Sequence, residues 1–511
     1  MKKGNNTTSI RGDWPVLSLL FVWSVIVLLM QSPDSPLHEP LYREDSSWLF
    51  MCGKAWMNGL LPYQDFTDSK GPLIWLVYGL AYLLSPRSYT GVFWITCLCY
   101  TLTLYCHYRT SHLLLNDKRC ALAVAMIMIF PYLWFWFHTE VRAEDFAALP
   151  VSASLYCMMK LLCTQQRDNE LLKRLFCMIG ACLAALVLIK FNFAAMQASM
   201  VVAALWCIVR ERISLAKPML WLASGAGLVV LPFLLWFLIT GTMKVFVGEY
   251  FINTLQSVAA PDGFLGSYID ELLASLRAPS RLALLIAILY GGWLMTPRLR
   301  RCPWAPLLSG LAFYLIATRH SLWEYYYNIC TTFVIFVVIC AVDIVRRPMK
   351  LSVFAWIVAA ALVWGWIENR IGSKETVDYP LSRIVKGRCE QQMEIFNHIA
   401  EIMSEVEKPR ILNLYGFERS YGLQVEALPA GRYWSYQNGM TPEMEQGHRQ
   451  ILTQGLADFV IVEDISRCFK AGIGPHNLRE YGYEDCLNWK TLTASGREKN
   501  FKLYRKKTSF Q

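Results

Sequence analysis

The segment PMLWLASGAGLVVLPFLLWFLI spans residues 218–239 and carries no charged residue. A helix needs about 17–25 predominantly apolar residues to cross the hydrocarbon core of a bilayer, so this segment predicts a transmembrane helix. Apolar runs of 15 or more residues recur along the chain from Trp14 to about Ile367. A soluble core does not require so many uniformly apolar segments, and the sequence therefore predicts a polytopic α-helical membrane protein.

The composition agrees with this prediction. Of the 511 residues, 55% are hydrophobic and only 17% are charged, against roughly 25% charged residues in an ordinary soluble domain. The net charge of +10 does not indicate nucleic acid, because the basic residues lie in short loops between apolar runs, as in cytoplasmic anchors of membrane helices. We therefore expect the lipid bilayer as a partner and no nucleic acid.

The basic loops also predict the orientation. Cytoplasmic loops carry an excess of Lys and Arg, and placing these loops and the N-terminus in the cytoplasm lets the apolar runs alternate without conflict. The first run is expected to be a retained helix, because no small-x-small cleavage site follows it. About eleven spans result, with the C-terminus outside. The expected spans are 14–30, 91–106, 120–137, 145–163, 175–190, 194–210, 218–239, 281–296, 303–317, 328–345 and 351–367.

One apolar run does not fit this alternation. Residues 71–85, GPLIWLVYGLAYLLS, would invert every later loop if they crossed the membrane. The run is short, rich in Trp and Tyr, and followed by Pro86, which is typical of an interfacial helix lying on the bilayer. Residues 31–90 are therefore predicted to form a large first outer loop with juxtamembrane helices, within a transmembrane module of residues 1–370.

The composition changes after about residue 370, and residues 371–511 predict a small extracytoplasmic α/β domain. Residues 390–407 have helical spacing of apolar positions, and residues 411–416 and 458–464 are typical of short buried strands. Thr441 is the expected N-cap of a further helix, since Pro442 can occupy the first helical position at no cost.

Ionisable and aromatic residues collect in the loops that this topology places outside. Such groups are costly at membrane depth and indicate function by default, so a shared cavity is expected. Each also has a structural alternative: the lysines and Arg319 can reach the interface as amphipathic side chains, an acid can cap a helix, His320 can bond a helix end, and the tyrosines can form an aromatic belt. The residues are Glu44, Asp45, Asp65, Asp68, Lys70, His138, Glu140, Arg142, Glu144, Asp145, Lys190, Arg319, His320, Glu324 and Tyr325–Tyr327.

The first loop has the most specific local sequence. Glu-Asp-Ser-Ser-Trp-Leu-Phe (44–50) is followed by Gly59, by Pro-Tyr at 62–63 and by Asp-Ser-Lys-Gly-Pro at 68–72. This pattern resembles the first outer loop of the C-type (GT-C) membrane glycosyltransferases. It is most similar to the family 39-like branch, which includes protein O-mannosyltransferases and lipid A aminoarabinose transferases. Arg-Ala-Glu at 142–144 and Lys-x-Asn at 190–192 also resemble that branch, and the resemblance covers roughly residues 14–345.

The resemblance implies an enzyme of the outer face, expected in a bacterial inner membrane, that uses a polyprenyl-phosphate sugar as donor. An acid of the first loop is then the catalytic base, with Asp45 the first choice and Glu44 the second. Basic residues hold the lipid phosphate: Lys70 and Arg142, then Lys190, Arg319 and His320. Candidate substrate-binding residues are Asp65, Asp68, Glu144 and Tyr325. Some relatives bind a divalent metal through an acid beside the Lys. Ser69 stands at that position here, so the resemblance permits a metal without requiring one, and no cofactor is assigned.

The chemistry of sugar transfer agrees with these residue types. A carboxylate can take the proton of an acceptor hydroxyl, and cations can stabilise the charge on a leaving phosphate. One carboxylate with a basic cluster favours inverting transfer to a glycan, lipid or protein acceptor, although Glu144 could supply the second carboxylate of a retaining enzyme. A transporter or flippase of an amphipathic lipid-linked substrate is the alternative, and it predicts paired polar residues at the bilayer midplane and broken helices in both halves of the chain. A non-catalytic scaffold would not require the cluster of acids and bases.

Overall fold

The computed structural model describes most of the membrane module and of the C-terminal domain. The described residues are 10–32, 34–37, 45–133, 140–164, 168–253, 279–295, 324–345, 386–414, 420–435, 441–463, 477–492 and 498–507. The expected spans at 303–317 and 351–367, and the expected domain boundary near residue 370, lie outside them.

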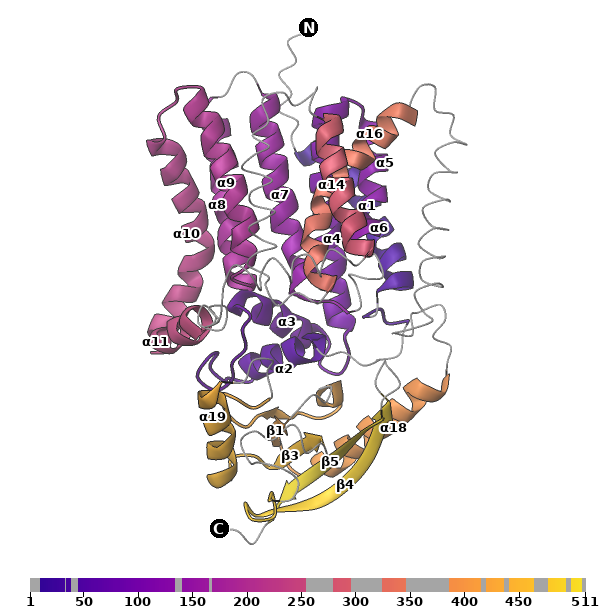
Figure 1. Ribbon diagram of the computed structural model, residues 1–511, viewed down its shortest axis with the longest axis vertical. Coiled ribbons are helices and arrows are strands. Elements are labelled where there is room, and N and C mark those ends of the chain that lie inside the picture. The colour runs from indigo at the N-terminus through magenta and orange to yellow at the C-terminus, as the bar shows by residue number, and fades with distance from the viewer. Residues whose placement is uncertain are drawn as a thin grey trace.

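The membrane module is a bundle of long helices, most of them aligned with the long axis of the molecule (Figure 1). Within the described residues, six helices are long and apolar enough to cross a membrane. The chain is therefore an integral, polytopic membrane protein, as predicted. The elements of the bundle are η1 (Ile10–Asp13), α1 (Trp14–Gln31), α4 (Thr90–Leu115), α5 (Lys118–Ile127), α6 (Ile129–Tyr132), α7 (Ala143–Cys163), α8 (Asn169–Ile189), α9 (Phe193–Arg210), α10 (Ala216–Ile239), α11 (Met243–Phe246), the π-helix η2 (Val247–Ile252), α14 (Pro279–Met295), the 3-10 helix η3 (Glu324–Val334) and α16 (Ile335–Val345).

The span expected at residues 120–137 differs from the structure. The helix breaks, with α5 ending at Ile127 and α6 beginning at Ile129. Pro131 explains the break, because it lacks an N–H and its ring collides with the carbonyl four residues earlier, that of Ile127.

Two short helices, α2 (Asp45–Met57) and α3 (Pro72–Leu84), lie across one end of the bundle. Figure 1 shows them between the long helices and the C-terminal domain. The predicted juxtamembrane helix at 71–85 is thus present as α3. We call this end of the molecule the α2–α3 end.

The C-terminal domain is built on a five-stranded sheet with the order β2-β1-β3-β5-β4. Strands β2, β1 and β3 are parallel, and β5 is antiparallel to both of its neighbours. The predicted N-cap is confirmed, since the hydroxyl of Thr441 accepts a hydrogen bond from the backbone N–H of Met444. The elements are α18 (Lys386–Met403), β1 (Arg410–Leu414), η4 (Ser420–Leu423), β2 (Leu428–Pro429), α19 (Pro442–Thr453), β3 (Phe459–Glu463), β4 (Tyr483–Leu492) and β5 (Glu498–Lys506).

The domain is fixed to α2 by a buried lysine. Lys54 Nζ donates to the carbonyl of Gly422 at 2.8 Å and to that of Val425. Burial lowers the pKa of Lys54 to about 8. A second contact of the domain is an ion pair, in which Arg432 lies 3.1 Å from Glu249 of η2. The C-terminal domain therefore supports α2 from the side that faces away from the bundle.

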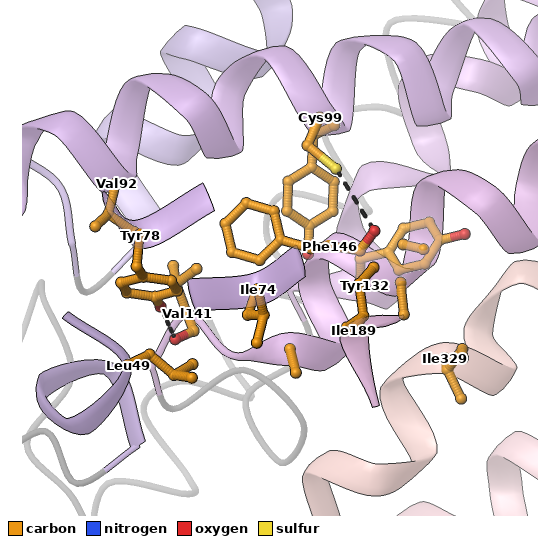
Figure 2. Close-up of a cluster of buried hydrophobic side chains, with 14 of the residues drawn as sticks. Leu49, Ile74, Tyr78, Val92, Cys99, Tyr132, Val141, Phe146, Ile189 and Ile329 are labelled. Carbon is orange, nitrogen blue, oxygen red and sulfur yellow. Dashed lines mark hydrogen bonds between the residues drawn. The ribbon is translucent and has the colours of Figure 1, made fainter. Parts of the chain in front are cut away.

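Helices α2 and α3 pack on a hydrophobic cluster that reaches into the bundle. Figure 2 shows Leu49 of α2, Tyr78 of α3 and Phe146 of α7 in this cluster. The hydroxyl of Tyr78 donates to the carbonyl of Val141 at 2.8 Å. The same cluster thus positions α3 and the segment that precedes α7.

Glycine allows α2 and α3 to touch at their crossing point. A Cβ at Gly53 would lie 2.4 Å from the backbone N of Gly79, and no side-chain rotation can relieve this contact.

Gly53→Ala is therefore expected to lower the free energy of unfolding by about 1–3 kcal/mol, the usual cost of overpacking. Thermal unfolding in detergent measures the change. Gly12→Ala is the control, because nothing lies within 4 Å of a Cβ there, and equal stability of both variants would contradict the packing.

Candidate functional site

Asp45, the first residue of α2, lies between two cations from different segments. Its Oδ1 is 3.1 Å from Lys70 Nζ, and its Oδ2 is 3.1 Å from Arg142 Nε. Asp45 and Arg142 are 97 residues apart in the chain. The predicted base and the two foremost predicted phosphate ligands therefore share one site at the α2–α3 end.

Each cation of this site has a further carboxylate partner. Lys70 Nζ lies 3.2 Å from Asp68 Oδ2, and Arg142 also donates to Glu140. Lys190 Nζ lies 2.9 Å from Glu144 Oε1. Ion pairs thus form one run of alternating charges, Asp68–Lys70–Asp45–Arg142–Glu140. The pair of Lys190 and Glu144 lies close enough for Lys190 to influence the charge of Asp45. We call these seven residues the ionic cluster: Asp45, Asp68, Lys70, Glu140, Arg142, Glu144 and Lys190.

Tyrosines of η3 cover two of the cations. The ring centroid of Tyr325 lies 3.9 Å from Arg142 Cζ, and that of Tyr326 lies 4.0 Å from Lys190 Nζ. A cation over an aromatic face is stabilised by roughly 0.5–2 kcal/mol, more when it is desolvated. The tyrosine run therefore contributes to the site through Tyr325 and Tyr326.

A glycine brings the first loop against the end of α8. The N–H of Gly71 donates to the carbonyl of Ile189 at 2.9 Å. A Cβ at Gly71 would lie 2.1 Å from the carbonyl oxygen of Leu188. Only glycine fits this contact, and it places Lys70 near Lys190, which follows α8 directly.

The segment before α7 holds the first turn of α2. The backbone N–H of Ser46 donates to Glu140 Oε2 at 2.8 Å. The hydroxyl of Ser46 donates to the carbonyl of Val141. A carboxylate at a helix N-terminus interacts favourably with the helix dipole and with its unpaired N–H groups. Glu140 therefore fixes both the backbone next to Asp45 and the guanidinium of Arg142.

The charges of the cluster shift the pKa values of its members. Burial by itself raises the pKa of Asp45, but the positive charges of Lys70, Arg142 and Lys190 outweigh it and hold the pKa well below its usual range. Burial opposes the charged form of Lys70 too, yet Asp45 and Asp68 raise its pKa. Glu140 and Asp45 likewise raise the pKa of Arg142 against the effect of burial. Asp45 is therefore ionised at neutral pH.

The structure separates the predicted site residues into three groups. Asp65 was a substrate-binding candidate, but its Oδ2 accepts the N–H of Leu61 at 2.7 Å and stabilises the turn that it belongs to. Glu44, Arg319 and His320 lie outside the described residues. The other predicted residues belong to the ionic cluster or contact it: Asp45, Asp68, Lys70, Arg142, Glu144, Lys190 and Tyr325.

Two members of the site belong to the outer set that the sequence places near a shared cavity, but the sequence assigns them no role. A helix cap is the structural alternative for Glu140, and an aromatic belt is the alternative for Tyr326. Their position next to Arg142 and within the run 325–327 was the available signal. As for a metal, the part of the chain that the structure describes has no group of three His, Cys, Asp or Glu side chains suited to hold one.

The lowered pKa of Asp45 predicts how stability depends on pH. Its folded-state pKa lies below the unfolded value of about 3.9, so the ionised carboxylate stabilises the fold above that pH, and the stabilisation is lost as the pH falls toward the folded-state pKa. Asp45→Asn is expected to lower the free energy of unfolding at pH 7 by about 1–3 kcal/mol, because Lys70 and Arg142 each lose a charged partner. The difference in stability from wild type should stay nearly constant from pH 7 to about pH 5 and should narrow as the pH falls below about 4.

Thermal unfolding at graded pH measures this difference. Asp168→Asn is a matched control, since Asp168 caps α8 by accepting the N–H of Leu171 at 2.7 Å, and Asn caps a helix equally well. If the stability of Asp45→Asn relative to wild type stays constant or falls further below about pH 4, the assignment of an ionised carboxylate to Asp45 is contradicted.

Comparisons with known proteins bear on the fold and on the family resemblance of the chain. Residues 69–236 match the family model of the dolichyl-phosphate-mannose-protein mannosyltransferases. No curated protein sequence matches the chain. The chain is similar to the crystal structure of ArnT from Cupriavidus metallidurans bound to undecaprenyl phosphate, with a TM-score of 0.54 and 10% identity over 97% of this chain and 98% of that one. It also aligns with the oligosaccharyltransferase AglB from Archaeoglobus fulgidus, in complex with an inhibitory peptide and a dolichol-phosphate, with a TM-score of 0.44 and 12% identity over 98% of this chain and 75% of that one. The chain therefore has the GT-C fold over nearly its whole length, and its resemblance to the family 39-like membrane glycosyltransferases is confirmed.

Proposed function

We propose that this protein is a membrane glycosyltransferase that moves a sugar from a polyprenyl-phosphate donor to an envelope acceptor on the outer face of the membrane. The observation that carries the proposal is the carboxylate of Asp45 held at 3.1 Å from both Lys70 and Arg142. The family model over residues 69–236 and the fold shared with ArnT support it. The basic loops support an outer orientation of the α2–α3 end.

The proposed step is a single displacement with inversion. The acceptor hydroxyl attacks the anomeric carbon, its proton passes to Asp45, and the bond from that carbon to the phosphate oxygen breaks. The polyprenyl phosphate leaves with the electron pair. Its extra negative charge is stabilised by Lys70 and Arg142, which act strongly because the site is largely shielded from water.

The charge balance of the cluster requires an exchange of partners. Three cations face four carboxylates, a formal charge of −1, so an incoming phosphate has to replace a carboxylate at Lys70 or Arg142. Asp45 is the carboxylate best placed to give way, since its side chain is 22% exposed whereas those of Asp68 and Glu144 are 7% and 2% exposed. Binding of the donor then frees the carboxylate and restores its basicity.

Loss of the base should abolish transfer. Asp45→Asn is expected to reduce kcat by about 10²–10⁴-fold, the usual contribution of a positioned general base, with the protein still folded and able to bind polyprenyl phosphate. Labelled sugar transferred from a polyprenyl-phosphate sugar to extracted envelope glycans and glycolipids measures it, with Asp168→Asn as the control. Near-normal transfer by the Asp45→Asn, Glu44→Gln double variant would contradict the mechanism, and counterflow of intact donor without transfer would indicate a transporter.

The cation beside the base predicts a pH effect. In wild type, Lys70 helps to hold the pKa of Asp45 low, so activity should not fall as the pH is lowered from 7 to 5. Lys70→Met removes that charge, so the pKa of Asp45 in the donor-free protein rises. The acid limb of the kcat/KM profile, which reports the free enzyme, should move to higher pH, with a lower maximal rate. Lys173→Met, at an exposed position of α8, is the control. An unshifted acid limb in Lys70→Met would argue against Asp45 as the base.

A further inference from the structure

The side chain of Asp145 connects three elements beneath the ionic cluster without belonging to it. Its Oδ2 accepts the backbone N–H of Arg142 at 2.8 Å, which closes the first turn of α7. Its Oδ1 accepts the hydroxyl of Tyr100 in α4 at 2.7 Å and the side-chain amide of Asn328 in η3 at 3.2 Å. Asp145 is only 2% exposed. A simple helix cap would need only the first of these contacts.

The contact with Asn328 leads back to Arg142. A 3-10 helix has three residues per turn, so side chains three positions apart lie on the same face. Asn328 therefore stands above Tyr325 on η3, and the ring of Tyr325 lies against the guanidinium of Arg142 at 3.9 Å. The carboxylate of Asp145 thus fixes Arg142 in two ways. It binds the backbone N–H of Arg142 directly, and it binds the helix η3, whose Tyr325 ring contacts the guanidinium of Arg142.

We propose that Asp145 is a positioning residue that holds Arg142 ready for the phosphate of the donor. This inference rests on the proposed function, because Arg142 is there a ligand of the lipid phosphate. A guanidinium binds phosphate through two donors in a fixed geometry, so its orientation decides much of the affinity. Asp145 sets that orientation without itself contacting the donor.

The conservative substitution distinguishes positioning from mere packing. In Asp145→Asn the amide oxygen can still accept from Arg142. The new NH₂ group can donate to the hydroxyl of Tyr100 and, after the amide of Asn328 flips, to Asn328 Oδ1, which has no hydrogen-bond partner among the described residues. The network can therefore re-form. Asp145→Ala cannot replace either contact. Asn328→Leu leaves the cap of α7 intact and removes only the connection to η3.

The test measures binding of polyprenyl phosphate to the full-length protein in detergent, together with the donor KM and kcat. Asp145→Ala should weaken binding and raise KM by about 10-fold, Asn328→Leu by about 3-fold, and Asp145→Asn should recover most of the loss. In an Arg142→Ala background, Asp145→Ala should add less than about 2-fold, because a residue that acts through Arg142 has nothing left to position. Should Asp145→Ala fail to fold, Asn328→Leu in the two backgrounds gives the same comparison.

Asp13→Ala is the matched control. Asp13 is a buried carboxylate that accepts from Tyr105 at 3.0 Å and Arg109 at 3.2 Å, next to the N-terminus of α1. It should lose thermal stability with unchanged affinity for polyprenyl phosphate. Two results would overturn the positioning role alone. One is that Asp145→Ala weakens polyprenyl-phosphate binding by the same factor in the Arg142→Ala background as in wild type. The other is that Asp13→Ala weakens binding as much as Asp145→Ala does. A wild-type protein that neither binds polyprenyl phosphate nor transfers sugar would overturn the proposed function as well.

Discussion

The carboxylate of Asp45 joins the first loop to the segment before α7 through two ion pairs. Its two oxygens face cations from the first loop and from the segment before α7, and both cations are nearly buried. Taking such charges out of water costs several kcal/mol for each ion unless partners with good geometry replace the water. The alternation of cations and carboxylates in the ionic cluster provides those partners. The positions of α2, of the first loop and of the start of α7 are therefore mutually dependent.

The surrounding architecture holds this arrangement from both sides. On the bundle side, the hydrophobic cluster of Figure 2 packs α3 against α4 and α7. On the other side, the C-terminal domain is hydrogen-bonded to Lys54 of α2, nine residues after Asp45. An aromatic contact joins the same two elements, since the ring centroid of Trp434 in the C-terminal domain lies 5.8 Å from that of Trp48 in α2. Helix α2 is thus packed between the helical bundle and the C-terminal domain, which is the support that the proposed catalytic group at its first residue needs.

The features that the sequence predicts well are those with a local signal. Uniform apolarity predicts α10 from composition alone, and the hydroxyl of Thr441 before Pro442 predicts the start of α19. The motif of the first loop predicts that Asp45 and Lys70 belong to one site. The break before Pro131 also has a local cause, although the apolar run conceals it.

Other features depend on contacts that no local pattern encodes. Glu140 reaches the N–H of Ser46 across 94 residues of chain, and Asp145 reaches Asn328 across 183. The packing of distant segments decides these directions, so the sequence alone indicates which residue types are present but not which way they point.

The most direct test of the account is an experimental structure of the protein with polyprenyl phosphate bound. The account predicts that the phosphate oxygens lie about 3 Å from Lys70 Nζ and from the guanidinium of Arg142, with the carboxylate of Asp45 beside them and released from at least one cation. A phosphate bound at the opposite end of the bundle, or at the α2–α3 end but away from both cations, would contradict it.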